Sequence, residues 1–218
     1  RFTKWRAVLK IGHQIPTQTC IAANANLLAR FAALSQEAGL VPIVEPEVLI
    51  EGDQTLSLCE EITQQVLRTV FHTLEDYRVD LTGVILKTNM VTPATYCRQQ
   101  ASAEQVAQAT LRCLHRSVPA EVAGIVFLSG GQTEVQATER LNAIGRLSDG
   151  PWRLSFSFDR ALKDSALRTW NGLDVNILEA QWAFLHRAWC NCLALEGKYD
   201  HEMENSPIDR HPALAVYA

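Results

Sequence analysis

The sequence has no long apolar run and no stripe of basic residues. No hydrophobic stretch approaches the roughly 20 residues that cross a bilayer, and the opening RFTKWRAVLK lacks the apolar segment of a signal peptide. The formal net charge is -4, and the 20 Lys and Arg residues are scattered, unlike the basic footprint of a nucleic-acid-binding protein. We therefore expect no membrane and no nucleic-acid partner, and a cytoplasmic location. A targeting segment upstream of Arg1 would lie outside this sequence.

The cysteines and histidines also lack the spacings of disulfide frameworks and metal sites. There is no C-x-x-C pair, so we expect six reduced thiols, and Cys190 and Cys192 fall in a helical pattern that points them away from each other. The six histidines include no H-E-x-x-H or similar ligand spacing. The sequence therefore predicts neither a metal site nor a cofactor.

The length and composition indicate an ordinary globular protein. The chain has 218 residues, of which 47% are hydrophobic and 20% are charged, enough to bury a core. An α/β barrel typically needs about 250 residues. If the fold is a barrel, its length predicts an incomplete one.

Short apolar runs alternate with stretches of helical period, which is typical of βα units around a parallel sheet. The expected helices follow Pro16 as far as Gly39, cover residues 62–74, start after Ser102, run over about 133–144 before Gly145, and fill two stretches up to Gly197. Ser102 and Gln105 form a plausible capping box. The expected strands are 5–11, 40–44, 81–86, 124–128 and 152–158.

Periodicity leaves two architectures open, a doubly wound sheet and part of a (β/α)₈ barrel. Polar residues lie at or just after nearly every expected strand, where the functional groups of a barrel gather. Strand ends that merely emerge into solvent would also be polar. The residues concerned are Lys10, Glu45, Lys87, Ser129 and Arg160.

Lys87 closes the apolar run GVILK and is the most reactive candidate. Burial disfavours the charged ammonium, and a neutral amine attacks ketones. The alternative is a snorkelling lysine at a sheet edge. Glu45 and Glu47 flank Pro46 after another strand, where a carboxylate can carry the protons that imine formation requires, or can belong to a solvated turn.

The segment Ser129-Gly130-Gly131 is a candidate anion site. It lies between a strand and a helix, so its unhindered backbone N–H groups suit a phosphate, although an ordinary tight turn has the same sequence. Arg160, after the next strand, can add a bidentate contact to the same anion. Phosphate sites after the last two strands recur in (β/α)₈ barrels.

Several strings closely resemble class I fructose-bisphosphate aldolases. They occur in the family's order and cover nearly the whole chain: KWRAVLKI at 4–11, VPIVEPEVL at 41–49, ILKTNMV at 85–91, FLSGGQ at 127–132, SFSFDRAL at 155–162 and LEGKY at 195–199. The resemblance implies a (β/α)₈ TIM barrel, here incomplete at the N-terminus because the first three strands are missing. Residues 1–199 would form the barrel portion and residues 200–218 a C-terminal tail.

The resemblance also implies a Schiff-base lyase that reversibly cleaves fructose 1,6-bisphosphate into dihydroxyacetone phosphate and glyceraldehyde 3-phosphate in glycolysis. It implies a metal-independent enzyme with a sugar phosphate substrate, and usually a homotetramer. The implied catalytic residues are Lys87 as Schiff-base lysine, Glu45 as proton carrier, Lys4 as neighbouring cation, Glu47 as orienting group and Tyr217 as mobile tyrosine. The implied phosphate contacts are Arg6 for the far phosphate and Ser129, Gly130, Gly131, Ser157 and Arg160 for the near one.

Three positions depart from the family pattern. Thr88 follows the lysine where the family has Pro, Asp159 precedes the phosphate arginine where it has Gly, and Ala218 follows the terminal tyrosine. A carboxylate beside a phosphate site is unfavourable by like charge. Asp159 and the missing strands therefore leave a rival hypothesis open, a truncated or non-catalytic binding or assembly protein on the aldolase scaffold. A metal-dependent aldolase is a more distant alternative.

Overall fold

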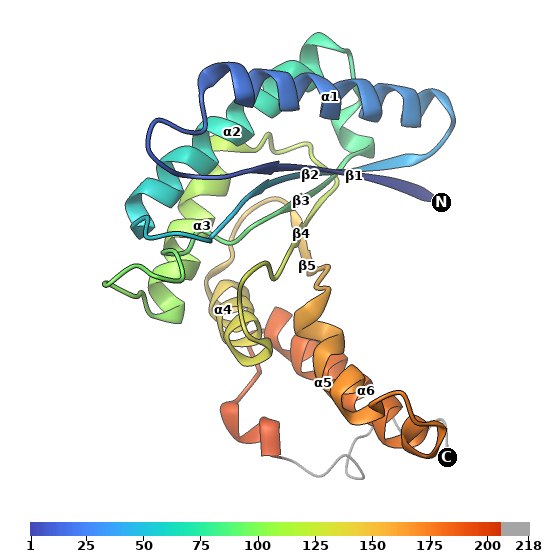
Figure 1. The fold of residues 1–218 in the computed structure, drawn as a ribbon. Coiled ribbons are helices and arrows are strands. Elements are labelled where there is room, and N and C mark those ends of the chain that lie inside the picture. Colours follow the sequence, from blue (N-terminus) through green and yellow to red (C-terminus); the bar gives the residue numbers. More distant parts are fainter. Residues whose placement is uncertain (206–218) are drawn as a thin grey trace.

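The computed structural model describes residues 1–205, whose five strands form one curved parallel sheet with the connecting helices packed on its outer side (Figure 1). The spatial order follows the chain, β1-β2-β3-β4-β5, and every neighbouring pair is parallel. A doubly wound sheet reverses its strand order at a switch point, and this sheet does not. The strands are β1 (Phe2–Leu9), β2 (Val41–Val48), β3 (Ile85–Thr88), β4 (Gly124–Phe127) and β5 (Arg153–Phe156).

The helices form the outer layer and begin at well-defined caps. Thr17 and Thr55 each accept a backbone N–H from the first turn of their helix, and the capping box of Ser102 and Gln105 is confirmed. The α-helices are α1 (Gln18–Glu37), α2 (Leu56–Asp76), α3 (Ala103–Ser117), α4 (Glu134–Leu147), α5 (Arg160–Trp170) and α6 (Ile177–Leu195). Short 3₁₀ turns are η1 (Leu81–Gly83), η2 (Asp174–Asn176) and η3 (His201–Asn205).

The core lies between the sheet and the helices. Alternate residues of β1, Ala7 and Leu9, are buried there, together with the face of α1 that carries Ala25 and Leu28. Trp5 belongs to the same outward face and stacks at an angle on Phe31 of α1. The outward face of the sheet is thus apolar, which leaves the inward face available for polar side chains. Within residues 1–205, no helix is both long enough and apolar enough to cross a bilayer.

Two predicted boundaries in the first half of the chain are wrong. The second strand continues past residue 44 to Val48, so Glu45 and Glu47 lie inside β2 and not in a turn after it. The run 81–86 is not one strand, because Leu81–Gly83 forms a 3₁₀ turn and β3 starts at Ile85. The other three expected strands are present with shifted ends.

The predicted end of α4 at Gly145 is also wrong. The helix continues to Leu147, and at Gly145 it lies against the last residues of α6. A Cβ atom at Gly145 would lie 2.5 Å from the carbonyl oxygen of Ala194 and 2.6 Å from that of Leu195. This glycine therefore allows close helix packing and does not stop the helix.

Candidate functional site

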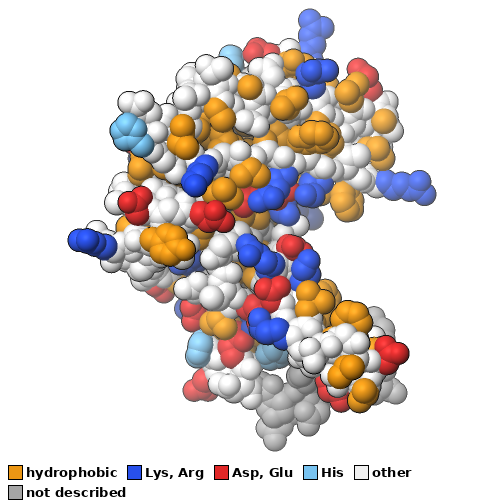
Figure 2. Space-filling model, in the orientation of Figure 1, with side chains coloured by type: hydrophobic (Ala, Val, Ile, Leu, Met, Phe, Trp, Pro, Cys, Tyr) orange, Lys and Arg blue, Asp and Glu red, His pale blue; other side chains and the backbone are white. Residues whose placement is uncertain are grey.

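A polar cavity of about 480 Å³ opens on the inward face of the sheet. Figure 2 shows Lys and Arg side chains, with acidic ones among them, gathered along the recess between the upper part of the molecule and the α5–α6 pair. The size is within the range of small-molecule sites. The cavity is lined by Lys4, Arg6, Glu45, Glu47, Lys87, Leu128, Ser129, Gly130, Ser157, Phe158, Asp159 and Arg160.

The strand register explains why these residues meet. In β1 and β2, Arg6 lies opposite Glu45, and side chains two residues apart share one face. The pairing of Ile43 with Ile85 continues this row, so Glu45 and Lys87 are also level with each other across β2 and β3. Lys4, Arg6, Glu45, Glu47 and Lys87 consequently project together into the cavity.

Glu45 joins two lysines. Its Oε1 lies 3.1 Å from Lys87 Nζ and its Oε2 lies 3.0 Å from Lys4 Nζ. Glu45 is 3% exposed and Lys87 is 9% exposed, so this contact is shielded from water, whereas Lys4 reaches the open part of the cavity. The arrangement places a carboxylate within proton-transfer distance of a nearly buried amine.

A second ion pair lies one step further along the same strands. Arg6 Nε donates a hydrogen bond to Glu47 Oε2. This hydrogen bond, together with the Glu47 charge, raises the pKa of the Arg6 guanidinium above its ordinary value despite partial burial. A Cβ atom at Gly130 would lie 2.7 Å from Glu47 Oε1, so glycine is required for the loop after β4 to approach this carboxylate.

The opposite side of the cavity is built from the segments after β4 and β5. Ser129, Gly130, Ser157 and Arg160 line it, as the sequence predicts for an anion site. Gly131 does not line the cavity. It has a φ of +74°, and a Cβ atom there would lie 2.6 Å from the side chain of Ile50, so Gly131 shapes the turn.

The Ser-Gly-Gly segment precedes the cap of α4 by two residues. Thr133 and Gln136 form a capping box, in which Thr133 Oγ1 accepts from Gln136 N–H and Gln136 Oε1 accepts from Thr133 N–H. The backbone N–H groups of Ser129 and Gly130 lie before that box, and neither donates to an acceptor within the described part of the chain. Ser129 and Gly130 line the cavity, whereas no residue of α4 does.

Sequence reasoning missed Lys163 as the partner of Asp159. Asp159 lines the cavity and forms an ion pair with Lys163, four residues later in the first turns of α5. The hydrogen bond from Lys163 holds the pKa of Asp159 below its ordinary value. The Asp-Lys spacing of four residues at a helix start was the available signal. Thr88 is buried and does not line the cavity.

Three other expectations concern residues away from the cavity. Lys10 lies just after β1 but does not line the cavity. Tyr217 lies outside the described residues. All six thiols are free, with Cys190 buried and Cys192 exposed on α6, as predicted. Among residues 1–205 no group of three or more His, Cys, Asp or Glu side chains is arranged to hold a metal ion.

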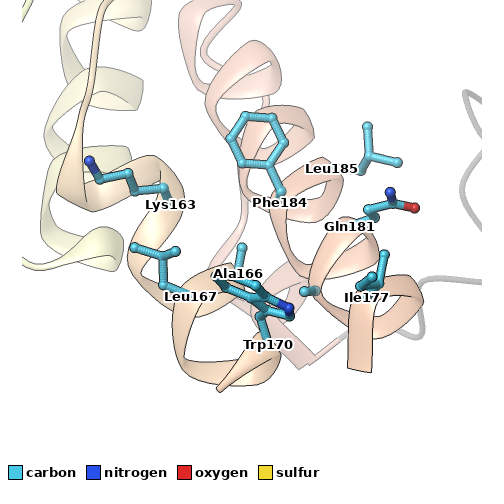
Figure 3. A pocket seen from close by; sticks show the side chains of 9 residues that line it. Lys163, Ala166, Leu167, Trp170, Ile177, Gln181, Phe184 and Leu185 are labelled. Carbon is cyan, nitrogen blue, oxygen red and sulfur yellow. The ribbon is translucent and has the colours of Figure 1, made fainter. Parts of the chain in front are cut away.

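A larger hollow of about 720 Å³ lies between α5 and α6 (Figure 3). Its wall is almost entirely apolar, with Trp170, Phe184 and Leu185 among its residues, and Lys163 stands at its edge. It offers no set of convergent polar groups and is therefore a packing surface.

Comparison with known proteins gives the same result from sequence and from structure. The profile described as "Fructose-bisphosphate aldolase class-I" matches residues 1–215. The fructose-bisphosphate aldolase of Dictyostelium discoideum is 50% identical over 204 residues, which are 93% of this chain and 57% of that protein. Fructose-bisphosphate aldolase B of Mus musculus is 51% identical over 92% of this chain and 55% of that protein.

A solved structure of fructose-bisphosphate aldolase from Plasmodium falciparum, in complex with TRAP and a small-molecule inhibitor, superimposes with a TM-score of 0.90. It is 44% identical, and the match covers 92% of this chain and 58% of that one. This similarity confirms the predicted TIM-barrel class, with five of the barrel's strands present here. The chain spans just over half the length of the relatives it matches.

Proposed function

We propose that this chain, which belongs to the class I fructose-bisphosphate aldolase family, carries the Schiff-base half of an aldolase site and acts in the reversible cleavage of fructose 1,6-bisphosphate. The products would be dihydroxyacetone phosphate and glyceraldehyde 3-phosphate. The substrate is a sugar phosphate, and the role is glycolytic. Because the chain spans little more than half of its relatives, this activity is proposed for the barrel that contains the chain.

The observation that carries the proposal is the position of Lys87 beside Glu45. An almost buried amine 3.1 Å from an almost buried carboxylate, on the inward face of a parallel sheet, has the geometry of a nucleophile with its proton carrier. Leu128 and Phe158 form an apolar part of the wall of the same cavity. Few structural roles would need Lys4, Glu45 and Lys87 in contact on one such face.

In the proposed reaction, Glu45 takes a proton from Lys87, and the amine so formed attacks the substrate ketone. Glu45 then delivers this proton to the carbinolamine oxygen, which leaves as water. A protonated imine remains. A base then removes the proton of the C4 hydroxyl, the C3–C4 bond breaks, and its electron pair flows to the imine nitrogen as an enamine. The aldehyde leaves, the enamine carbon is protonated, and water releases dihydroxyacetone phosphate from Lys87. Lys4 holds the second oxygen of Glu45 during these transfers.

The phosphates would be held at the two sides of the cavity. We assign the near phosphate to Arg160, Ser157 and the backbone N–H groups of Ser129 and Gly130, with Gly131 shaping the turn. The far phosphate would be met by Arg6, which Glu47 holds in place. Tyr217 would take part in proton exchange from the C-terminal segment.

The family relationship also supports a homotetramer in the cytoplasm as the working arrangement. The second candidate function is that of a non-catalytic binding or assembly protein. Two observations favour it: the outer edges of β1 and β5 pair with no strand in residues 1–205, and Asp159 places a carboxylate in the anion side of the cavity. Both functions predict a folded chain, but only the first predicts imine chemistry.

The test is borohydride trapping of the imine. Incubating the 218-residue chain with dihydroxyacetone phosphate and borohydride should attach one reduced adduct, and peptide mapping should locate it at Lys87. The Lys87→Arg variant should take up none, because a guanidinium stays protonated and forms no imine. An adduct on Lys4 or Lys10 would overturn the assignment of Lys87. No adduct on a chain shown to be folded would replace the proposal by the binding-protein alternative.

A further inference from the structure

Regular pairing between β2 and β3 stops where the buried ion pair of the cavity begins. The last paired residues are Val44 and Leu86, and Glu45 and Lys87 follow them directly. Hydrogen bonds between neighbouring strands fix the spacing of the strands. Something other than regular strand pairing must therefore hold Glu45 Oε1 within 3.1 Å of Lys87 Nζ.

Each of these two strands stays paired on its other side. β2 pairs with β1 as far as Val48, and β3 pairs with β4 as far as Thr88. This leaves a seam, by which we mean the unpaired stretch between residues 45–48 and residues 87–90. Glu45 lies on one side of the seam and Lys87 on the other, so the geometry of the seam sets the distance between the carboxylate and the amine.

The side chain of Asn89 crosses this seam. Its Oδ1 accepts a hydrogen bond from the Val48 N–H at the end of β2, over 3.1 Å. Its Nδ2 donates to the carbonyl oxygen of Met90 at 3.2 Å and to Thr63 Oγ1 of α2 at 3.4 Å. All four residues are buried, so water does not compete for these contacts. The amide of Asn89 thus joins the two sides of the seam and ties them to the outer helix.

We propose that Asn89 is a positioning residue for the imine chemistry: by joining the end of β2 to the segment after β3, it holds Glu45 at the distance from Lys87 that proton transfer requires. Asn89 does not line the cavity, so it acts through the two strands and not on the substrate. Proton transfer needs heavy atoms about 2.6–3.2 Å apart. A misplacement of about 1 Å can cost about 10²-fold in rate. The inference rests on the proposed function for the reaction that is served, whereas the positioning itself is a property of the fold.

The first experiment tests the contact itself, by hydrogen exchange of the 218-residue chain at the resolution of single amides. In the parent, the Val48 N–H should be as protected as the Leu49 N–H, which donates to β1. Asn89→Leu keeps the approximate size of the side chain and removes the acceptor, so the Val48 N–H should exchange about tenfold faster. Thr110→Val is the matched control, because Thr110 Oγ1 accepts the Val91 N–H in an equally buried contact that does not cross the seam. It should speed exchange at Val91 and leave Val48 protected.

The second experiment measures borohydride-trapped labelling of Lys87 over a range of dihydroxyacetone phosphate concentrations. In Asn89→Leu the maximal rate should fall about 10- to 10²-fold. The half-saturating concentration should stay unchanged, because the anion side of the cavity follows β4 and β5 and lies away from the seam. Asn89→Asp retains Oδ1 as acceptor for the Val48 N–H and should recover most of the rate. Thr110→Val should label at the parental rate, although it also loses a buried hydrogen bond.

Acetylation of Lys87 by acetic anhydride provides a measurement that needs no substrate. It reports how well the ion pair with Glu45 shields the amine, and it should be several-fold faster in Asn89→Leu than in the parent or in Thr110→Val. Rapid exchange of the Val48 N–H in the parent, or equal labelling and acetylation rates in Asn89→Leu and Thr110→Val, would overturn the inference. Faster acetylation of Asn89→Leu with no trapped adduct in any of the chains would uphold the positioning role and reject the proposed imine chemistry.

Discussion

Lys87 Nζ lies 3.1 Å from Glu45 Oε1, and both side chains are almost completely buried. Burying one charged partner without the other would be costly, so each residue makes the other tolerable at this position. The second oxygen of Glu45 is bonded to Lys4, which leaves the carboxylate fixed between two amines. A fixed carboxylate needs no reorganisation before it transfers a proton, which is the arrangement that acid-base catalysis favours.

Replacement of Glu45 by glutamine should slow imine formation without weakening phosphate binding. The amide keeps the size of the side chain but carries no transferable proton, and loss of such a group typically costs about 10² to 10⁴-fold in rate. The measurement is the rate of borohydride-trapped labelling by dihydroxyacetone phosphate, with phosphate affinity measured in parallel. Glu51→Gln, exposed and outside the cavity, is the control. Labelling of Glu45→Gln at the parental rate would assign the proton carrier to Glu47 or another group.

The sequence predicted the order of the elements better than their ends. Alternating apolar runs and helical stretches were sufficient for five βα units, but β2 was ended at Val44, where the polar residues and Pro46 begin. The structure explains the exception. Val41 N–H donates to Arg1 and Leu49 N–H donates to Leu9, so odd-numbered residues of β2 direct their donors toward β1. Pro46 is even-numbered, so the position of its missing N–H is directed toward β3. The hydrogen-bonded pairing of β2 with β3 ends before it, at Val44. The absence of an N–H group at Pro46 therefore removes no hydrogen bond between strands.

Site residues could be predicted from the sequence where they lie at the end of a strand or within one. The register of the parallel sheet brings such residues to one face. Lys87 and Glu45 illustrate this, since their meeting follows from adjacent parallel strands. The engagement of Asp159 by Lys163 was not predicted, because it depends on a side chain turning away from its capping position. The pattern of polar residues at strand ends does not show whether an aspartate caps its helix or pairs with a lysine. The packing role of Gly145 was missed for a similar reason, since it depends on a distant helix.

The cysteines should separate into two reactivity classes. Burial raises the pKa of Cys113 to about 12 and that of Cys190 to about 11, and it also raises the pKa of Cys59. Because the thiolate is the nucleophile, Cys113 should react with iodoacetamide at pH 8 about 10³-fold more slowly than a free cysteine. Cys20 and Cys97, which are only partly buried, should react first. Timed alkylation with peptide mapping measures these rates.

The control for this prediction is alkylation in strong guanidinium chloride, where all six thiols should become equally reactive. Protection that disappears on unfolding is a property of the fold and not of the local sequence. If Cys113 in the folded chain reacts as fast as Cys97, the buried position of α3 in this structure is incorrect.

Glu204 should make the free energy of unfolding decrease as the pH falls into the acid range. Burial raises the pKa of Glu204, but hydrogen bonds from Arg187 and Tyr199 and the arginine charge outweigh it and leave the pKa below its ordinary value. A carboxyl group with a lowered folded pKa stabilises the fold above its unfolded pKa of about 4.3, and this contribution is lost as the pH falls through the folded pKa. Glu204→Gln should therefore be less stable than the parent at pH 7, and the difference should vanish in strong acid.

Urea unfolding at a series of pH values between 7 and 3 tests this dependence. Glu202→Gln, exposed in the same 3₁₀ turn, is the control and should follow the parent at every pH. A parent and a Glu204→Gln variant that lose stability in parallel would show that the contact of Glu204 with Arg187 does not contribute in solution.

The 218-residue chain alone should self-associate and cleave little or no fructose 1,6-bisphosphate. The outer edges of β1 and β5 pair with no strand in residues 1–205, and the apolar hollow between α5 and α6 exposes Trp170 and Phe184 (Figure 3). Exposed strand edges and apolar patches of this kind promote pairing with other chains. In the family's barrel, we expect these surfaces to be covered by the three βα units that the resemblance places before β1. Supplying those units as a separate chain should therefore compete with self-association.

Light scattering over a range of concentrations measures the association, and an aldehyde-coupled assay measures cleavage with and without the three-unit segment. The segment should lower the apparent mass to that of a defined complex and increase cleavage, because it buries both edges and completes the cavity wall. Trp170→Ser should weaken both effects, since it removes the largest apolar side chain of the hollow. Tyr96→Ser, a highly exposed residue outside the hollow, is the matched control and should change neither. A monomeric chain that cleaves the substrate without the segment would show that five strands suffice, and that the open edges need no partner.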